Sequence, residues 1–175
     1  MFIKCNKTVI IKQQYMKKIV VMASVSFASG ILFVNIYNSL VNAVAVESDI
    51  PSSVIATREY FKTVNPGDFF KIFSPLTQLL ALVSLILFWK RSPSVRLFLA
   101  LALLFYMSAD VFTFIYFHPR NDIMFLSEKL PDTETLKRLA SEWSSMNWLR
   151  SLIVLLGIMS SFIAIHKIYT EKVTE

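Results

Sequence analysis

Glycine, cysteine and histidine are scarce in this chain of 175 residues, which contains three, one and two of them respectively. The single cysteine, Cys5, excludes an intramolecular disulfide, a CxxC redox pair and a cysteine-rich metal site. Two histidines and scattered carboxylates supply no recognisable ligand set, so we expect neither a metal ion nor a haem. The sequence also lacks a Walker loop, a GxGxxG fingerprint and a GxSxG elbow, and we expect no bound cofactor.

Hydrophobic residues make up 55% of the chain, and they gather in four long runs. Each run is long enough for the roughly 20 residues of a membrane-crossing helix. The sequence therefore predicts an all-α fold, a four-transmembrane-helix bundle over residues 19–170, between a basic segment at 1–18 and a short tail at 171–175. The predicted spans are Ile19–Val46, Phe69–Trp89, Val95–Phe117 and Asn147–His166.

The net charge of +6 could suggest a nucleic-acid partner, but the distribution of the basic residues argues against one. They precede the first span, fill the short connection after the second, and follow the last. The positive-inside rule then places both termini and the short connection in the cytoplasm, in the inner or plasma membrane. We expect a lipid bilayer as partner and no nucleic acid. The residues concerned are Lys4, Lys7, Lys12, Lys17, Lys18, Lys90, Arg91, Arg96, Lys167 and Lys172.

The N-terminal region leaves two alternatives open. Translation could start at Met16, just before Lys17, which would leave Met1–Tyr15 as an extension without structure of its own. The triplet Ala43-Val44-Ala45 also fits the A-x-A cleavage site of a signal peptide. The apolar run before it is longer than the roughly 7–15 residues of a signal-peptide core, so we expect the first span to be retained.

The two longer connections each predict a short amphipathic helix. The first covers Ser52–Val64, and Asn65-Pro66-Gly67 breaks it before Asp68 caps the next helix. The second starts near Thr133 and runs on into the fourth span, after a turn at His118–Asp122 that ends the third span. Together these two helices are expected to roof one end of the bundle.

Polar residues inside the spans gather at the same end of every run. If the helices alternate in direction, all of these residues fall on one side of the bilayer, and the predicted topology makes that side the outer one. An asparagine in hydrocarbon needs a partner, so this set predicts either a polar pocket or interhelical hydrogen bonds. The set is Asn35, Asn38, Asn42, Ser74, Thr77, Gln78, Asp110, Thr113, Asn147, Arg150 and Ser151.

Asp110 is the most informative single residue, because a lone carboxylate inside a span costs about 2.5–3.5 kcal/mol on insertion scales. Arg150 is the natural partner, and we predict the two within hydrogen-bonding reach or one water apart. The pair either locks two helices together or orients a substrate. His118, the only histidine near this end, is a candidate general acid or base and equally a surface residue. The candidate catalytic residues are therefore Asp110, His118 and Arg150.

Two short motifs carry a family resemblance. His118-Pro119-Arg120-Asn121-Asp122 follows the third span, and Trp143 and Arg150 lead into the fourth. This arrangement resembles the anthrone oxygenase-like family of small four-helix integral membrane proteins. A Pro-x-Asn motif closes the third span in that family, matched here by Pro119 and Asn121. A Trp…His…Arg pattern opens the fourth, matched by Trp143 and Arg150.

The resemblance covers nearly all of Lys17–Thr170 by span order and loop length, with one departure. Asn147 stands where the family usually has histidine, so a mechanism that relies on that imidazole does not carry over. The resemblance implies oxidation of anthrones to anthraquinones with molecular oxygen and no obvious cofactor, as in a few fungal members. Most bacterial members have no assigned activity.

The leading hypothesis is an outward-facing pocket for a lipophilic aromatic small molecule, in an oxygenase or related oxidoreductase. The alternative is a non-catalytic binding or partner-subunit protein whose buried polar residues are structural. Transport is a weaker option, because four spans without repeats or broken helices lack the usual features of a transporter. The candidate substrate-binding residues are Asn35, Asn38, Gln78, Asn121, Trp143 and Asn147.

Overall fold

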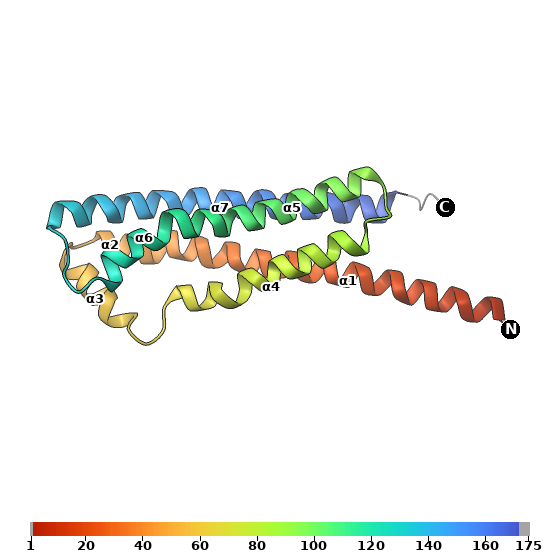
Figure 1. Ribbon diagram of the computed structural model, residues 1–175, viewed down its shortest axis with the longest axis horizontal. Coiled ribbons are helices and arrows are strands. Elements are labelled where there is room, and N and C mark those ends of the chain that lie inside the picture. The colour runs from red at the N-terminus through yellow and green to blue at the C-terminus, as the bar shows by residue number, and fades with distance from the viewer. Residues whose placement is uncertain (1, 172–175) are drawn as a thin grey trace.

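The computed structural model describes residues 2–171, with side chains from residue 14 onward, and forms an elongated bundle of helices (Figure 1). The all-α prediction is confirmed, and no strand occurs between residues 2 and 171. The helices are α1 (Phe2–Tyr37), η1 (Asn38–Asn42), α2 (Ala43–Glu47), α3 (Ser52–Tyr60), α4 (Pro66–Leu87), α5 (Pro93–Phe112), η2 (Thr113–Phe117), α6 (His118–Asn121), η3 (Asp122–Leu126) and α7 (Thr133–Thr170), where η marks a π-helix.

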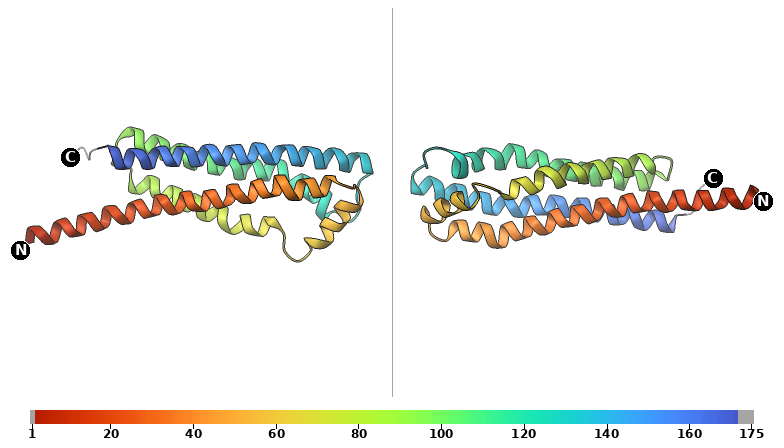
Figure 2. Two further views of the ribbon diagram at one scale, coloured as in Figure 1. Left: turned by 180° about the vertical axis from the view of Figure 1, so that it is seen from behind. Right: turned by 90° about the horizontal axis from the view of Figure 1, so that it is seen from below.

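Four helical segments are long and apolar enough to cross a membrane: Gln14–Glu47, Pro66–Leu87, Pro93–Leu126 and Thr133–Thr170. They run side by side along one axis in all three views (Figures 1 and 2). Their outward faces carry exposed apolar side chains such as Leu79, Leu104 and Phe162, whereas small and polar residues are buried between them. A folded surface of this kind suits lipid rather than water. The chain is a multi-pass membrane protein.

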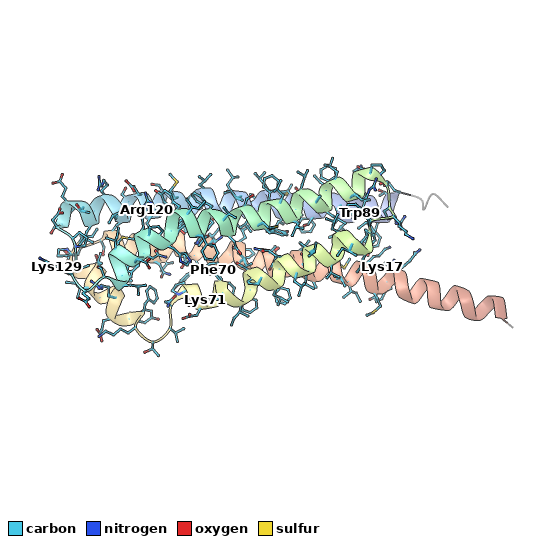
Figure 3. All side chains as sticks on the ribbon, viewed as in Figure 1. Lys17, Phe70, Lys71, Trp89, Arg120 and Lys129 are labelled. Atoms are coloured by element: carbon cyan, nitrogen blue, oxygen red, sulfur yellow. The ribbon has the colours of Figure 1, made fainter. Side chains whose placement is uncertain are left out.

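The two ends of the bundle differ in what they carry. Both termini and the short turn at 88–92 lie at one end, and α3 with the longer connections lies at the other (Figure 1). Figure 3 shows Lys17 and Trp89 toward the first end and Arg120 and Lys129 toward the second. The alternating direction of the spans is therefore as predicted, and the polar parts of the spans lie toward the end with α3.

The third span continues past His118, so the predicted turn at His118–Asp122 is wrong. The backbone N–H of His118 donates to the carbonyl of Thr113, five residues back, which makes η2 a π-turn. A proline inside an α-helix lacks an N–H and clashes with the carbonyl four residues before it. The wider π-turn, placed directly before Pro119, provides room for its ring. The helix then runs to Leu126.

The N-terminal helix also differs from expectation. Helix α1 begins at Phe2, so the prediction that Met1–Tyr15 would lack structure of its own is wrong. Helix α3 ends at Tyr60, four residues before the predicted Val64. The predicted tail at 171–175 falls almost entirely outside the described residues.

Helices α4 and α7 begin with side-chain caps. Asn65 is the N-cap of α4, and its Oδ1 accepts from the Gly67 N–H at 2.8 Å. Asp68 does not cap the helix alone, but accepts from the Asn65 N–H at 3.1 Å, which completes a capping box. At α7, Asp132 accepts from the Thr135 N–H at 2.9 Å, and this bond lowers the pKa of its carboxyl. Helix α7 therefore starts outside the apolar run and enters it without a break.

The connections at the α3 end have a small core of their own. Val54 of α3, Met124 of η3 and Leu136 of α7 are all buried there, together with Val46 of α2. Arg58 of α3 also donates to the backbone carbonyl of Ser127. These contacts hold α3 against the other elements, so this end of the bundle is closed by packed side chains rather than by loose loops.

Candidate functional site

A cavity of about 40 Å³ lies among the four spans. It has room for roughly three water-sized molecules. Every span contributes side chains to its wall, and several of the polar residues singled out in the sequence meet there. The lining is Ala28, Ile31 and Asn35 from α1, Phe70, Ser74, Thr77 and Gln78 from α4, Tyr106, Ala109, Asp110 and Thr113 from α5 and η2, and Arg150 and Val154 from α7.

Asp110 projects into this cavity from the last turns of α5. Gln78 of α4 donates its side-chain N–H to the Oδ2 of Asp110 at 2.6 Å. This bond links two neighbouring spans and holds one oxygen of the carboxyl group. Ser74 of α4 lies beside the same carboxyl group and also lines the cavity.

Arg150 borders the same cavity from α7, and only 7% of its surface is exposed. Its Nη2 donates to the Oδ1 of Asn147 at 2.8 Å. The guanidinium carbon lies 5.0 Å from the ring centroid of Phe70 and 4.6 Å from that of Phe117, within the range of cation–π contacts. Among the described residues its buried Nε has no hydrogen-bond partner. Arg150 is therefore fixed at one edge, while the Nε remains available as a donor.

Asp110 and Arg150 both border the cavity, but no direct ion pair joins them within the described part of the chain. Direct hydrogen bonding between them, one of the two predicted arrangements, is therefore not found. Gln78 and Asn147 hold the two charged groups instead. A bridge between them through one water remains a prediction.

Asn35 of α1 contributes a third polar group to the wall. Only 1% of its surface is exposed. Neither its Nδ2 nor its Oδ1 has a hydrogen-bond partner among the residues described here. Since a buried carboxamide is normally hydrogen-bonded, this pair of atoms calls for an explanation.

The remaining candidate residues lie outside the cavity. His118 is exposed and stacks on Phe114, with ring centroids 4.8 Å apart, on an outward face of the span. Asn38 accepts a hydrogen bond from Asn42 at 2.6 Å. The other three form part of the packing around α6 and the start of α7, and they are Asn121, Trp143 and Asn147.

Asn147 has a supporting position. It is completely buried, and its Nδ2 donates to the Trp143 carbonyl one turn back, at 3.1 Å. Its Oδ1 accepts the hydrogen bond from Nη2 of Arg150. The side chain therefore bonds in both directions along α7 and holds Arg150 at the edge of the cavity.

Sequence reasoning missed several residues at or near the site. Phe70 and Tyr106 line the cavity, but aromatic residues are so frequent in membrane spans that their identity carries no signal. Arg120 pairs with Glu142 at 2.8 Å and packs over the ring of Tyr116 at 3.6 Å, which fastens α6 to α7. That pair could have been proposed from the opposite charges in the second long connection.

The metal-binding groups do not converge in this structure. Between residues 14 and 171, no three His, Cys, Asp or Glu side chains come close enough together to hold a metal ion. The polar groups of the cavity are two amides, one carboxyl, one guanidinium and small hydroxyls. Such a set suits hydrogen bonding to an oxygen-bearing organic group.

Comparison with known families adds a second line of evidence. A family model described as anthrone oxygenase matches residues 68–160, which is more than half of the chain. The chain belongs to the anthrone oxygenase family. The matched segment begins in the first turn of α4 and ends within α7, so it contains Gln78, Asp110 and Arg150, whereas Asn35 lies before it. No curated protein and no solved structure matches the chain.

Proposed function

We propose that this member of the anthrone oxygenase family binds a lipophilic aromatic ketone through its oxygen-bearing edge and oxidises it with molecular oxygen. The observation that carries the proposal is the meeting of Asp110, Arg150 and Gln78 at one cavity inside the spans. Ionisable residues at such positions are costly and usually functional. Membership of the family supports the reaction class.

The proposed chemistry needs a proton acceptor and a group that stabilises negative oxygen. An anthrone has a CH₂ group whose deprotonation places charge on the carbonyl oxygen. Asp110 is the candidate base for that proton, and Arg150 is the candidate donor to the enolate oxygen. The electron-rich enolate reduces dioxygen, and the CH₂ carbon becomes a second carbonyl with release of one water. In balance, one ketone and one O₂ give one quinone and one H₂O.

The size of the cavity adds a condition to this proposal. A molecule of three fused rings is far larger than about 40 Å³, so the cavity admits only one polar edge unless side chains move. Phe70, which is half-buried on the first turns of α4, is the side chain that we propose turns aside. The exposed apolar faces of the spans give a lipophilic ligand a route from the bilayer.

The orientation in the membrane is part of the same proposal. Both termini and the turn at 88–92 share one end of the bundle, and basic residues are concentrated there. The positive-inside rule favours that end in the cytoplasm, in the inner or plasma membrane. The cavity would then open toward the outer face.

Oxygen consumption by the purified protein, with anthrone as substrate, tests the catalytic proposal. General-base catalysis contributes roughly 10²–10⁴-fold, so Asp110→Asn should lose at least about 100-fold after subtraction of the uncatalysed reaction. The matched control is Asp122→Asn, an exposed carboxylate on the same span that lies outside the cavity. Unchanged turnover in Asp110→Asn would exclude its role as the base.

A second candidate function has one specific observation in its favour. Asp110 and Arg150 each have a hydrogen-bond partner within the protein, and the cavity between them is small. A non-catalytic membrane protein with a structural polar core would show the same bonds. In that case anthrone would not change the melting temperature of the unmodified protein, and neither this protein nor Asp110→Asn would consume oxygen above the uncatalysed rate.

A further inference from the structure

The hydrogen-bonding groups that line the cavity differ in whether they have a partner within the protein. The hydroxyl of Tyr106 bonds to the hydroxyl of Ser161 of α7 at 3.0 Å. Thr77 and Thr113 donate back to carbonyls of their own helices, each at 2.8 Å. Each of these three hydroxyls therefore already has a hydrogen-bond partner within the protein.

The buried side-chain atoms of the cavity wall that lack a partner lie on two neighbouring spans, α1 and α7. Asn35 of α1 offers two N–H donors and one carbonyl acceptor, and Arg150 of α7 offers its Nε donor. In the part of the chain that the structure describes, all of these atoms are buried without partners. A ligand that satisfies them must supply an acceptor and a donor close together.

Asn35 differs in this respect from the other asparagines of its helix and of α7. Asn38 and Asn42 bond to each other, and Asn147 bonds in two directions. Each of these bonds lies within one span, so the three side chains are satisfied inside their own helical segments. Asn35 makes no such bond to any side chain described from residue 14 to residue 171, although it is nearly as deeply buried as Asn147. Its carboxamide costs stability unless something else bonds to it.

We propose that Asn35 determines specificity at this site, by selecting a neutral ligand that carries a hydrogen-bond donor beside a carbonyl or other acceptor oxygen. The inference rests on the proposed binding site at the cavity and names its ligand class. The carboxamide donates to the acceptor oxygen, which also receives the Arg150 Nε–H, and accepts from the neighbouring hydroxyl. Asn35 precedes the matched segment 68–160, so this determinant comes from a part of the chain outside the family match.

The charges around the cavity argue for a neutral ligand. Asp110 and Arg150 already balance, and both line the wall. A carboxylate ligand would bring a second negative charge beside Asp110, in a site with little water to screen it. Fatty acids are abundant lipophilic carboxylates in any membrane, and this repulsion discriminates against them.

Three aromatic ketones of nearly the same size separate the possibilities. Phenacyl alcohol has a hydroxyl beside its carbonyl, propiophenone has a methyl in the place of that hydroxyl, and benzoylformate has a carboxylate. Binding of each is measured by equilibrium dialysis against the full-length protein in nanodiscs, with empty nanodiscs subtracted. We expect phenacyl alcohol to bind about 10-fold more tightly than propiophenone, the equivalent of one typical hydrogen bond. Benzoylformate should bind most weakly.

The Asn35→Leu variant assigns this preference to one residue. It keeps the size of the side chain, and it should bring phenacyl alcohol and propiophenone to within about twofold of each other. The control is Asn42→Leu on the same helix, outside the cavity, which should keep the preference. A preference that persists in Asn35→Leu, or tightest binding of benzoylformate by the unmodified protein, would overturn the proposal.

Thermal stability without ligand distinguishes a specificity residue from a structural tie. An unpartnered buried amide replaced by an apolar group of the same shape should leave the melting temperature unchanged or raise it. If Asn35→Leu melts lower or fails to fold, Asn35 is a tie between helices and the inference is wrong. The dialysis assay measures binding without turnover. If the protein consumed no oxygen but kept its preference for phenacyl alcohol, the proposed reaction would be rejected and the inference about Asn35 would stand. If it consumed oxygen but showed no such preference, only the inference about Asn35 would be rejected.

Discussion

Tyr106 of α5 packs directly over Gly157 of α7. A Cβ atom added at position 157 would lie 2.5 Å from Cε1 and 2.8 Å from Cδ1 of the tyrosine ring. The same ring lines the cavity, and its hydroxyl bonds to Ser161 one turn further along α7. The absence of a side chain at Gly157 therefore sets how closely α5 and α7 approach and where one wall of the cavity stands.

Gly157→Ala should destabilise the protein by about 1–3 kcal/mol, the usual cost of an added methyl group in a well-packed core. The tyrosine ring would have to move, so the bond to Ser161 should weaken as well. Gly30→Ala is the control, because no neighbouring atom lies within 4 Å of a Cβ there, and alanine is the better helix former. Thermal unfolding in detergent measures both variants. Equal melting temperatures for the two would contradict the close packing at Gly157.

The balance of charge between Asp110 and Arg150 predicts strong coupling between substitutions. Asp110→Asn leaves a buried guanidinium without a compensating charge, which typically costs about 3–5 kcal/mol. Adding Arg150→Met removes that charge, so the double variant should be more stable than Asp110→Asn alone. A double-mutant cycle of unfolding free energies measures the coupling. Simple additivity would show that the two groups do not act on each other across the cavity.

Arg120 and Glu142 form a partly exposed pair that joins α6 to α7. We expect Glu142→Gln to cost only about 0.2–1 kcal/mol, because solvent screens the pair and the packing of Arg120 over Tyr116 is kept. The loss should shrink as salt is added. Thermal unfolding at low and high salt measures it, with Glu59→Gln as the control, since the pair of Glu59 with Lys62 lies within one exposed turn. A large, salt-independent loss would show that Glu142 has another role.

The proposed orientation predicts which positions a reagent outside the cell can reach. In a Cys5→Ala background, a cysteine at the exposed position Glu128 should react with a membrane-impermeant maleimide on intact cells. A cysteine at Thr170, exposed at the opposite end of α7, should react only after the membrane is opened. Labelling at Thr170→Cys on intact cells would place the termini outside and reverse the proposed orientation.

The spans could be predicted because their signal is local. An apolar run of sufficient length predicts a membrane helix whatever its neighbours are, and all four runs became helices. Asn35, Gln78, Asp110 and Arg150 came together at one cavity because alternating helices bring the polar ends of the spans to one level. Depth along a helix follows from counting residues.

The direction in which each side chain points around its helix axis could not be predicted by counting residues. The spacing of Asn35, Asn38 and Asn42 predicts one face only if every turn has 3.6 residues, and η1 begins at Asn38. Asn35 lines the cavity, whereas Asn38 and Asn42 bond to each other beside it. The π-turn η2 precedes His118, which ends on an outward face with Phe114. Non-local packing selects such turns, and the sequence pattern does not reveal them.

The central claim is that the cavity between the spans binds a lipophilic molecule through its oxygen-bearing edge. Mass spectrometry of the small molecules that co-purify with the protein in mild detergent tests it most directly. Arg150→Met serves as the comparison, because it removes the donor from the cavity wall. We predict a recurrent lipophilic ketone, phenol or quinone with the unmodified protein and its loss from Arg150→Met. The same bulk lipids, and nothing else, from both proteins would contradict the account.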